Sequence, residues 1–386
     1  MASTAFQPHN LVQIVPRFTD VPSGVTDYAV RLAEGLRNRW GTHSVFLAGT
    51  PQDARNGVVT GWPTHAVASQ SAHDLVRALD ELRQTSPFDI IIVHVSGYGY
   101  ARRGAPVWLE SGLRRWLGRN RGVRVIGVFH ELFARGKPWR SSFWYGPLQA
   151  RVSRRLWQLA HAGLTTNTPY ADQLLAWRPE ARPFLTLMPV ISTVGEPAAL
   201  APFRDRKPTA VVFGSPGLES RLYGAEVATL AQTVRRLGIG EIIDIGGRRQ
   251  PPPAEIGGAF VRTLGKQPAA AISDEMSACR FGFLAYDLAH VGKSTVFAAY
   301  AAHGVIPVCF GPSVEIADGL SAGRHLLRPP IDISSETVLS AMQLELIAWY
   351  RHHDSSNLLE AIATLAGLAD DRIATHDNGH AWSLHG

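Results

Sequence analysis

The segment Phe281–Phe310 constrains the fold of this chain most strongly. An apolar run of strand length, Phe281–Tyr286, leads into a polar turn that ends at Gly292, followed by a small-residue helical segment, Ser294–His303, and a second apolar run, Val305–Phe310. Strand, loop, helix and strand in so short a span predict a right-handed parallel crossover. In open α/β folds, a loop of this kind lies at the carboxyl edge of the sheet, where ligands bind.

The same alternation of strands and helices occupies both halves of the chain. Phe88–Val95 is the clearest strand of the first half, and Thr209–Gly214 opens a second series. Ile191–Pro208 between them is rich in proline and lacks periodicity, as a linker does. We therefore predict an α/β protein with two Rossmann-like, doubly wound domains, residues 1–195 and 196–386. In an alternative division of the chain, the last helix packs on the first domain.

Composition narrows the class of protein. The chain is 45% hydrophobic and 18% charged, which is typical of a globular protein, and its net charge is +6. This charge favours anionic ligands or an acidic membrane surface, although a coding bias toward arginine is an equal explanation. Cys279 and Cys309 are too few for a disulfide framework or a zinc site. With no signal peptide or membrane-spanning run in view, we expect a cytoplasmic protein, alternatively peripheral at the inner membrane face.

Four short matches connect the chain to a known group. They have the order and spacing of a glycine-rich loop, a strand end, a strand with a basic residue, and the segment that closes a helix. In that order, they are Ser23–Val25, Phe129–Glu131, Phe213–Gly214 with Arg221, and Gly304–Val308. Together they resemble nucleotide-sugar glycosyltransferases of the GT-B fold, in the group of families 4 and 1. The resemblance implies an acceptor-binding N-terminal domain and a donor-binding C-terminal domain that face each other across a cleft. It also implies no bound metal and no cofactor other than the nucleotide-sugar substrate.

One departure from this resemblance concerns the donor helix. The retaining enzymes of the group carry two glutamates there, and the aligned positions of this chain are Val291 and Ala299. Neither side chain accepts a hydrogen bond from a ribose hydroxyl. We therefore predict that the paired-glutamate motif is lost.

Candidate donor-binding residues are glycines, cations and the start of the donor helix. Helix-end amides, hydroxyls and ammonium or guanidinium groups suit a diphosphate, and glycine permits close backbone approach. An ordinary helix cap is the simpler explanation of the Ser-Thr pair. A P-loop is disfavoured because Asp287 stands where its motif needs glycine. The predicted donor-binding residues are Gly24, Gly214, Arg221, Lys266, Gly292, Lys293, Ser294 and Thr295.

Candidate catalytic residues are His130, Glu131 and His290, because imidazole and carboxylate groups can take a proton from an acceptor hydroxyl. A structural histidine at a strand end is the alternative for His130. The basic and aromatic loop after Glu131 is predicted to bind a saccharide, lipid-linked or small-molecule acceptor, or a membrane surface, and no nucleic acid. The predicted acceptor-binding residues are Asp27, Tyr98, Trp139 and Arg140.

The resemblance implies a hexosyltransferase-like enzyme that moves a sugar from a nucleotide donor to a hydroxyl acceptor without metal. Two alternatives stay open. One is a catalytically degenerate GT-B protein that binds nucleotides or sugars, and the other is a different GT-B enzyme, such as a sugar-nucleotide epimerase or a phosphorylase.

Overall fold

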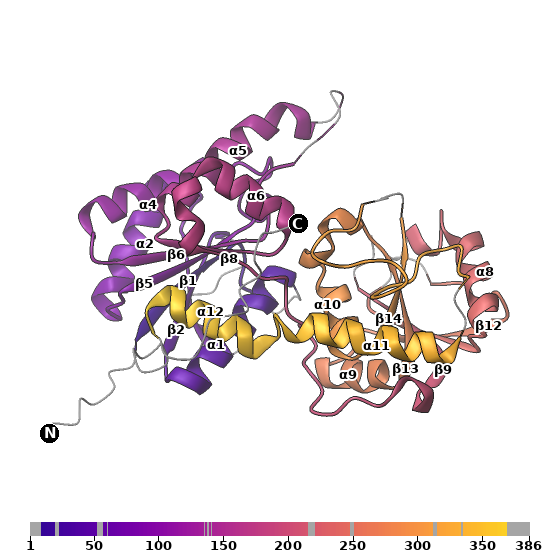
Figure 1. The fold of residues 1–386 in the computed structure, drawn as a ribbon. Coiled ribbons are helices and arrows are strands. Elements are labelled where there is room, and N and C mark those ends of the chain that lie inside the picture. Colours follow the sequence, from indigo (N-terminus) through magenta and orange to yellow (C-terminus); the bar gives the residue numbers. More distant parts are fainter. Residues whose placement is uncertain are drawn as a thin grey trace, which may run out of the picture. The chain divides into compact units, whose positions relative to one another are not determined.

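The computed structural model divides into two compact units, Met1–Met188 with Leu358–Gly386, and Pro189–Asn357 (Figure 1). The chain therefore passes between the units twice, after Met188 and after Asn357. Each unit is described by itself. The residues that the structure describes are 9–19, 23–51, 57–59, 61–134, 136, 139, 141–214, 221–247, 251–311, 315–332 and 335–368.

The first unit is built on an eight-stranded sheet in the order β3-β4-β2-β1-β5-β6-β7-β8. Every pairing is parallel except that of β3 with β4. Because β2 and β5 flank β1 on opposite sides, the strand order reverses between β1 and β5. The strands are β1 (Asn10–Val15), β2 (His43–Ala48), β3 (Gly57–Val59), β4 (Trp62–Ala66), β5 (Ile90–Val95), β6 (Arg124–Phe129), β7 (Ala162–Thr165) and β8 (Leu185–Leu187).

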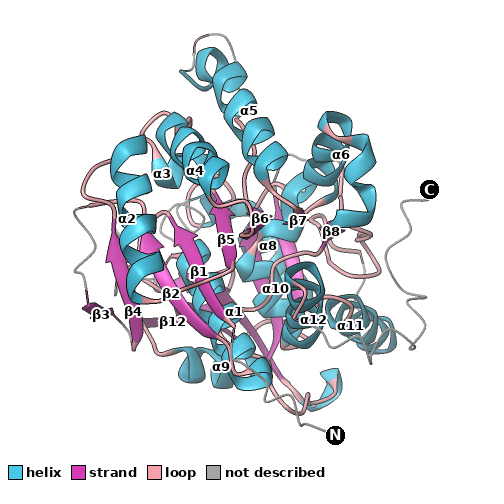
Figure 2. Cartoon of the chain, turned by 90° about the vertical axis from the view of Figure 1, so that its left-hand side faces the viewer, coloured by secondary structure: helices cyan, strands magenta, loops and turns pink. Residues whose placement is uncertain are grey.

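Helices cover both faces of this sheet (Figures 1 and 2). One face packs on α2, α4 and α5 through a large apolar cluster that includes Trp116 and Trp157. The other face packs on α1, and α12 lies against α1, where a Cβ atom on Gly35 would lie 2.5 Å from Leu359 Cδ1. The helices are α1 (Gly24–Trp40), α2 (Ala72–Thr85), α3 (Gly97–Tyr100), α4 (Val107–Arg119), α5 (Ser141–Leu159), α6 (Thr168–Trp177), η1 (Pro179–Phe184) and α12 (Ser355–Ala366).

The second unit has a six-stranded sheet in the order β11-β12-β10-β9-β13-β14. All pairings are parallel except that of β11 with β12, and the order reverses between β9 and β13. The strands are β9 (Lys207–Phe213), β10 (Glu241–Ile245), β11 (Glu255–Ile256), β12 (Ala259–Gly265), β13 (Cys279–Ala285) and β14 (Ile306–Phe310). The helices are η2 (Phe203–Asp205), α8 (Val227–Leu237), α9 (Ala269–Ala278), η3 (Leu288–Lys293), α10 (Thr295–Ala302) and α11 (Glu336–Arg351).

The predicted crossover is confirmed. β13 and β14 pair in parallel, with Phe281 opposite Ile306, and η3 and α10 connect them. Tyr300 of α10 fixes this helix on the sheet, because its hydroxyl lies 3.2 Å from the Val211 carbonyl and 3.1 Å from the Phe283 carbonyl. Gly282 makes room for the ring, since a Cβ atom there would lie 2.6 Å from Tyr300 Cε2. The first turn of α10 is thus held beside the point where the strand order reverses.

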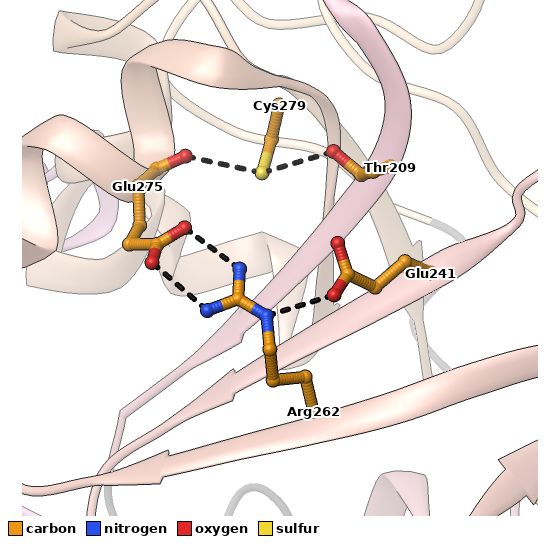
Figure 3. Close-up of polar contacts among 5 residues, drawn as sticks. All are labelled: Thr209, Glu241, Arg262, Glu275 and Cys279. Atoms are coloured by element: carbon orange, nitrogen blue, oxygen red, sulfur yellow. Dashed lines mark hydrogen bonds and ion pairs between the residues drawn. The ribbon is translucent and has the colours of Figure 1, made fainter.

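A polar cluster is formed by residues of β9, β10, β12, β13 and α9 (Figure 3). The Arg262 guanidinium donates two bonds of 3.0 Å to the Glu275 carboxylate and one of 2.7 Å to Glu241. Beside it, the Thr209 hydroxyl donates to Cys279 Sγ at 3.4 Å. The cluster connects β9, β10, β12 and β13 with α9, so its role is to stabilise the unit.

Candidate functional site

The loop between β13 and α10 is held from two sides. The Gly292 amide donates to the Asp318 carboxylate at 2.9 Å, and the Gly292 carbonyl accepts from the Val190 amide at 2.8 Å. At the start of the loop, the Asp287 carboxylate accepts from the Ala289 amide at 3.2 Å. These bonds fix η3, so the loop is a preformed part of the carboxyl edge.

The cap of α10 uses groups that sequence analysis assigned to a diphosphate. Ser294 is 4% exposed, its hydroxyl accepts from the Phe297 amide at 3.2 Å, and its own amide donates to the Val291 carbonyl at 2.9 Å. The Ser294 hydroxyl and the Gly292 amide, which were predicted to bind a diphosphate, therefore make hydrogen bonds to other groups of the protein. Lys293 and Thr295, between and beside them, are half-buried.

Asp318 was not predicted as a site residue. It is 7% exposed, and its backbone has φ of 63°, in the left-handed region that aspartate tolerates better than most residues. The Asp-Gly dipeptide at 318–319 is a turn signal that could have marked the position. What the sequence could not reveal is that its carboxylate meets Gly292, which lies 26 residues earlier in the chain.

A pocket of about 360 Å³ opens at the carboxyl end of β14. Two cations, Arg221 and Arg328, line it together with Glu226 and Thr229. The Arg328 guanidinium donates to the Gly311 carbonyl at 3.1 Å, which orients it at the pocket wall. Two guanidinium groups beside one carboxylate give the pocket a net positive character, which suits an anionic ligand.

The other predicted donor residues of this unit follow neighbouring strands. Gly214 comes directly after β9 and has φ of 138°, and exposed Lys266 comes directly after β12. The stem of Lys266 lies against Gly247, where a Cβ atom would be 3.0 Å from Lys266 Cε. Lys266 is not among the residues that line the pocket of Arg221. His290 is half-buried in η3, with its amide bonded to the Asp287 carbonyl at 3.1 Å.

In the first unit, His130 follows β6 at the carboxyl edge and is 8% exposed. Its Nε2 lies 3.2 Å from Nδ1 of His94, and Nε2 of His94 lies 2.9 Å from Oε1 of Gln13. The Gln13 amide continues to the Ser44 hydroxyl at 3.2 Å. This chain of buried polar groups crosses β2, β1 and β5 and reaches His130.

His94 and Gln13 were missed as site residues, although each interrupts an apolar strand, IIIVHV and LVQIV. Burial, and secondly the nearby His130, lower the pKa of His94 well below its usual value. The ring is therefore neutral. With the Gln13 carbonyl oxygen facing it, Nε2 of His94 carries the proton and Nδ1 accepts from Nε2–H of His130.

Glu131 and the residues around β1 and β5 complete this edge. The Ser96 hydroxyl donates to the Glu131 carboxylate at 3.0 Å, and the amides of both His130 and Glu131 bond to the Val95 carbonyl. Asp27, in the first turn of α1, is half-buried, and this burial raises the pKa of its carboxyl. Gly24 is exposed at the start of α1.

The predicted acceptor residues lie in separate places. Tyr98 is 49% exposed on α3, and its hydroxyl accepts from Gln149 Nε2 at 3.1 Å. Trp139 is 76% exposed, and Arg140 lies outside the described residues. In the described part of the chain, no three His, Cys, Asp or Glu residues gather as a metal would require. None of the helices described there is long and apolar enough to span a membrane.

Comparison with known proteins gives no match to a family model. No curated protein matches by sequence either. Solved structures do match over nearly the whole chain. A glycosyltransferase from Rickettsia africae ESF-5 has a TM-score of 0.59 at 9% identity, with 96% of this chain and 100% of that chain covered. An alpha-glucosyltransferase in complex with UDP and a DNA 13-mer has a TM-score of 0.57 at 11% identity, covering 94% and 100%. The pneumococcal O-GlcNAc transferase GtfA, in complex with UDP and GlcNAc, has a TM-score of 0.55 at 10% identity, covering 94% and 100%.

The chain has the GT-B fold. The predicted fold class is thereby confirmed, with a Rossmann-like sheet in each unit. Val291 and Ala299, the positions at which sequence analysis predicted the loss of the paired glutamates, are 1% and 0% exposed. They lie in the core of the second unit and present no carboxylate.

In this GT-B chain, several of the predicted site residues follow strands at a carboxyl edge, and of the predicted donor-binding residues only Arg221 lines the pocket beside β14. Gly24, Tyr98, His130 and Glu131 lie at the ends of β1, β5 and β6 or in the elements that follow them. In the second unit, Lys293 ends η3, the element that follows β13. Ligands of open α/β sheets bind at such positions.

Proposed function

We propose that this protein transfers a glycosyl group from a nucleotide-sugar donor to a hydroxyl acceptor, as a hexosyltransferase-like enzyme that needs no metal. The observation that carries the proposal is the pocket in which Arg221 and Arg328 meet at the carboxyl edge of the second unit, in a chain with the GT-B fold. The donor would bind to this C-terminal half, residues 196–386, and the acceptor to residues 1–195.

The chemistry explains why cations are needed. The bond between the anomeric carbon and the diphosphate oxygen breaks, and its electron pair leaves with the nucleoside diphosphate. Guanidinium groups of Arg221 and Arg328 stabilise this growing negative charge, with Lys266 and Lys293 as further candidates. The acceptor oxygen forms the new bond to the anomeric carbon, and its proton passes to a base.

His130 is our first candidate for that base. Its position at the carboxyl edge of the first unit, and its hydrogen bond to neutral His94, support this role. Glu131 is the second candidate, although its carboxylate accepts from Ser96, and His290 is the third. Asp27, Tyr98, Trp139 and Arg140 are proposed to bind the acceptor.

The first test is nucleotide binding. Two of the structurally similar proteins were solved with UDP, so UDP heads a calorimetric panel that also contains GDP, ADP and dTDP. Arg221→Ala and Arg328→Ala should each lower the affinity for the nucleotide about 10- to 100-fold, since a hydrogen bond to a charged group contributes about 1.5–3 kcal/mol. Arg235→Ala, at an exposed position in the last turn of α8, is the matched control.

The second test is turnover. The corresponding nucleotide sugars are incubated with and without EDTA, and release of nucleoside diphosphate is measured. Turnover that EDTA leaves unchanged supports the full proposal, whereas turnover abolished by EDTA and restored by a divalent cation contradicts metal independence. Binding without turnover of any donor would favour the degenerate binding protein. Binding that is equal in the two arginine variants and the control would refute the assignment of the pocket.

A further inference from the structure

The exposed face of α5 has an unusual composition. Its first half presents apolar and aromatic side chains, and its second half presents arginines. Trp144 is 71% exposed, Phe143 44% and Leu148 41%. The exposed residues of this face, in chain order, are Phe143, Trp144, Pro147, Leu148, Arg151, Arg154, Arg155 and Gln158.

The opposite face of α5 is anchored in the first unit. The Ser153 hydroxyl donates to the Leu132 carbonyl at 2.6 Å, and Trp157 Nε1 donates to the Leu174 carbonyl at 3.1 Å. Gln149 donates to the Arg103 carbonyl at 2.8 Å. The helix cannot rotate about its axis without breaking these buried bonds, so the apolar face stays turned outward. Figure 2 shows the first half of α5 extending beyond α4 and α6 of the same unit.

The segment of sequence that contains α5 is rich in positive charge. The sequence between Glu131 and Asp172 contains six Lys or Arg residues and no Asp or Glu, so this short segment carries as much net charge as the whole chain, +6. Glu110 of α4 approaches Arg155 Nη1 at 3.8 Å and Arg114 Nε at 3.1 Å. Glu110 therefore offsets part of the charge of Arg155, and Arg151 and Arg154 carry the positive charge of the exposed face.

We propose that this face of α5 docks on the surface of an anionic lipid bilayer. Phe143, Trp144 and Leu148 would enter the headgroup region, where amphipathic aromatic rings and short apolar side chains are stabilised. Arg151 and Arg154 would contact lipid phosphates, and a basic residue near such a surface contributes about 1 kcal/mol. The inference does not depend on the proposed transferase activity.

Two other occupants fit the face less well. A single-stranded nucleic acid gains from stacking on aromatic rings, but Pro147 and Leu148 in the middle of the face offer none. A second copy of the chain would bring the same arginines toward one another without acidic partners. A lipid surface accepts both the aliphatic and the cationic half of the face.

The experiment is co-sedimentation of the full chain with vesicles of phosphatidylcholine alone or mixed with phosphatidylglycerol, at low and high salt. Binding should require phosphatidylglycerol and weaken with salt. Arg151→Gln with Arg154→Gln should weaken it about 25- to 30-fold, the product of about fivefold for each arginine. Trp144→Ser with Leu148→Ser should also weaken it and reduce the quenching of tryptophan fluorescence by brominated lipids.

Matched controls are Arg121→Gln, at an exposed position after α4, and Leu344→Ser, whose leucine is 67% exposed on α11. Both should bind as the unchanged protein does. Thermal unfolding of all variants should be alike, since the substituted residues are exposed. The proposal is overturned if vesicle binding ignores phosphatidylglycerol or is equal in the arginine pair and its control. It is also overturned if vesicles are not bound while the face binds a single-stranded oligonucleotide, or a second copy detected by light scattering.

Discussion

Nδ1 of His94 lies 3.2 Å from Nε2 of His130, beneath α1 in the first unit. The Tyr28 ring packs edge-on against both imidazoles, with centroid distances of 6.1 Å to His94 and 5.0 Å to His130. His94 is completely buried, and its neutral ring contacts the carboxyl edge through His130. We therefore expect His94 to be a positioning residue that fixes the tautomer and orientation of His130.

The first prediction concerns this pair. Nitrogen-15 spectra of the imidazoles should show His94 neutral, with its proton on Nε2, down to acidic pH. His94→Leu should change the tautomer of His130 and lower kcat about tenfold with little change in KM, since one orienting hydrogen bond is lost. His73→Leu, at an exposed position on α2, is the control. An unchanged His130 spectrum in His94→Leu would show that the contact does not orient His130.

The second prediction concerns Asp318 and the loop it holds. Asp318→Ala removes the acceptor of the Gly292 amide and places alanine at φ of 63°, so we expect a loss of about 2–4 kcal/mol in unfolding free energy. Asp318→Asn keeps an acceptor and tolerates this backbone, so its loss should be below about 1 kcal/mol. Denaturant unfolding of both variants measures the difference. Equal losses would mean that the bond contributes little.

The third prediction is a loss of stability in acid. His353 is 1% exposed and packs on Trp349 at 4.3 Å between ring centroids. Burial lowers the pKa of His353 to about 3. In the unfolded chain this histidine takes up a proton near pH 6.5, whereas in the folded chain it stays neutral until about pH 3. Its contribution to the free energy of unfolding is therefore complete above pH 6.5 and is lost as the pH falls toward 3.

This histidine should contribute a decrease of about 2 kcal/mol between pH 7 and pH 5, because each pH unit below 6.5 corresponds to about 1.4 kcal/mol. His353→Leu should flatten the pH dependence of unfolding by that amount, whereas His73→Leu should leave it unchanged. Parallel pH profiles for His353→Leu and the unchanged protein would contradict the assignment.

The fourth prediction concerns Arg262, which contacts Glu241 and Glu275 (Figure 3). These hydrogen bonds raise the pKa of the guanidinium, which remains charged at every accessible pH. Arg262→Ala should lower the stability of the second unit by about 1–2 kcal/mol, because a bidentate, partly shielded network exceeds an isolated surface pair. Arg324→Ala breaks a more exposed pair with Glu345 and should cost below about 1 kcal/mol. Comparable losses in denaturant unfolding would contradict this ranking.

The fifth prediction concerns the two cysteines. Burial raises the pKa of Cys279 to about 11 and that of Cys309 to about 12, and both are at most 1% exposed. Thiolate is the reactive form, so neither thiol should react with a disulfide reagent at pH 8 until the protein unfolds. Two equivalents should react in guanidinium chloride. Rapid labelling of the folded protein would show that one of these strands opens.

Much of the fold follows from local patterns. The apolar runs at Phe281–Tyr286 and Val305–Phe310, with a short helical segment between them, allow few arrangements other than a parallel crossover. The same local logic placed His130 at a carboxyl edge, because a residue that directly follows a parallel strand must lie there. The polar residues inside strands were the signal that pattern analysis passed over, as Gln13 and His94 demonstrate.

The sequence by itself determined the α/β class, the position of the loops at the sheet edges and the positive charge of the segment that contains α5. Hydrophobic periodicity and residue order act over short distances along the chain, so they can be recognised without coordinates. Only the tertiary structure decided that Arg328 shares a pocket with Arg221, that Asp318 holds Gly292, and that His94 contacts His130. Each of these pairs joins segments far apart in sequence, and their meeting depends on strand order and packing, which no local pattern encodes.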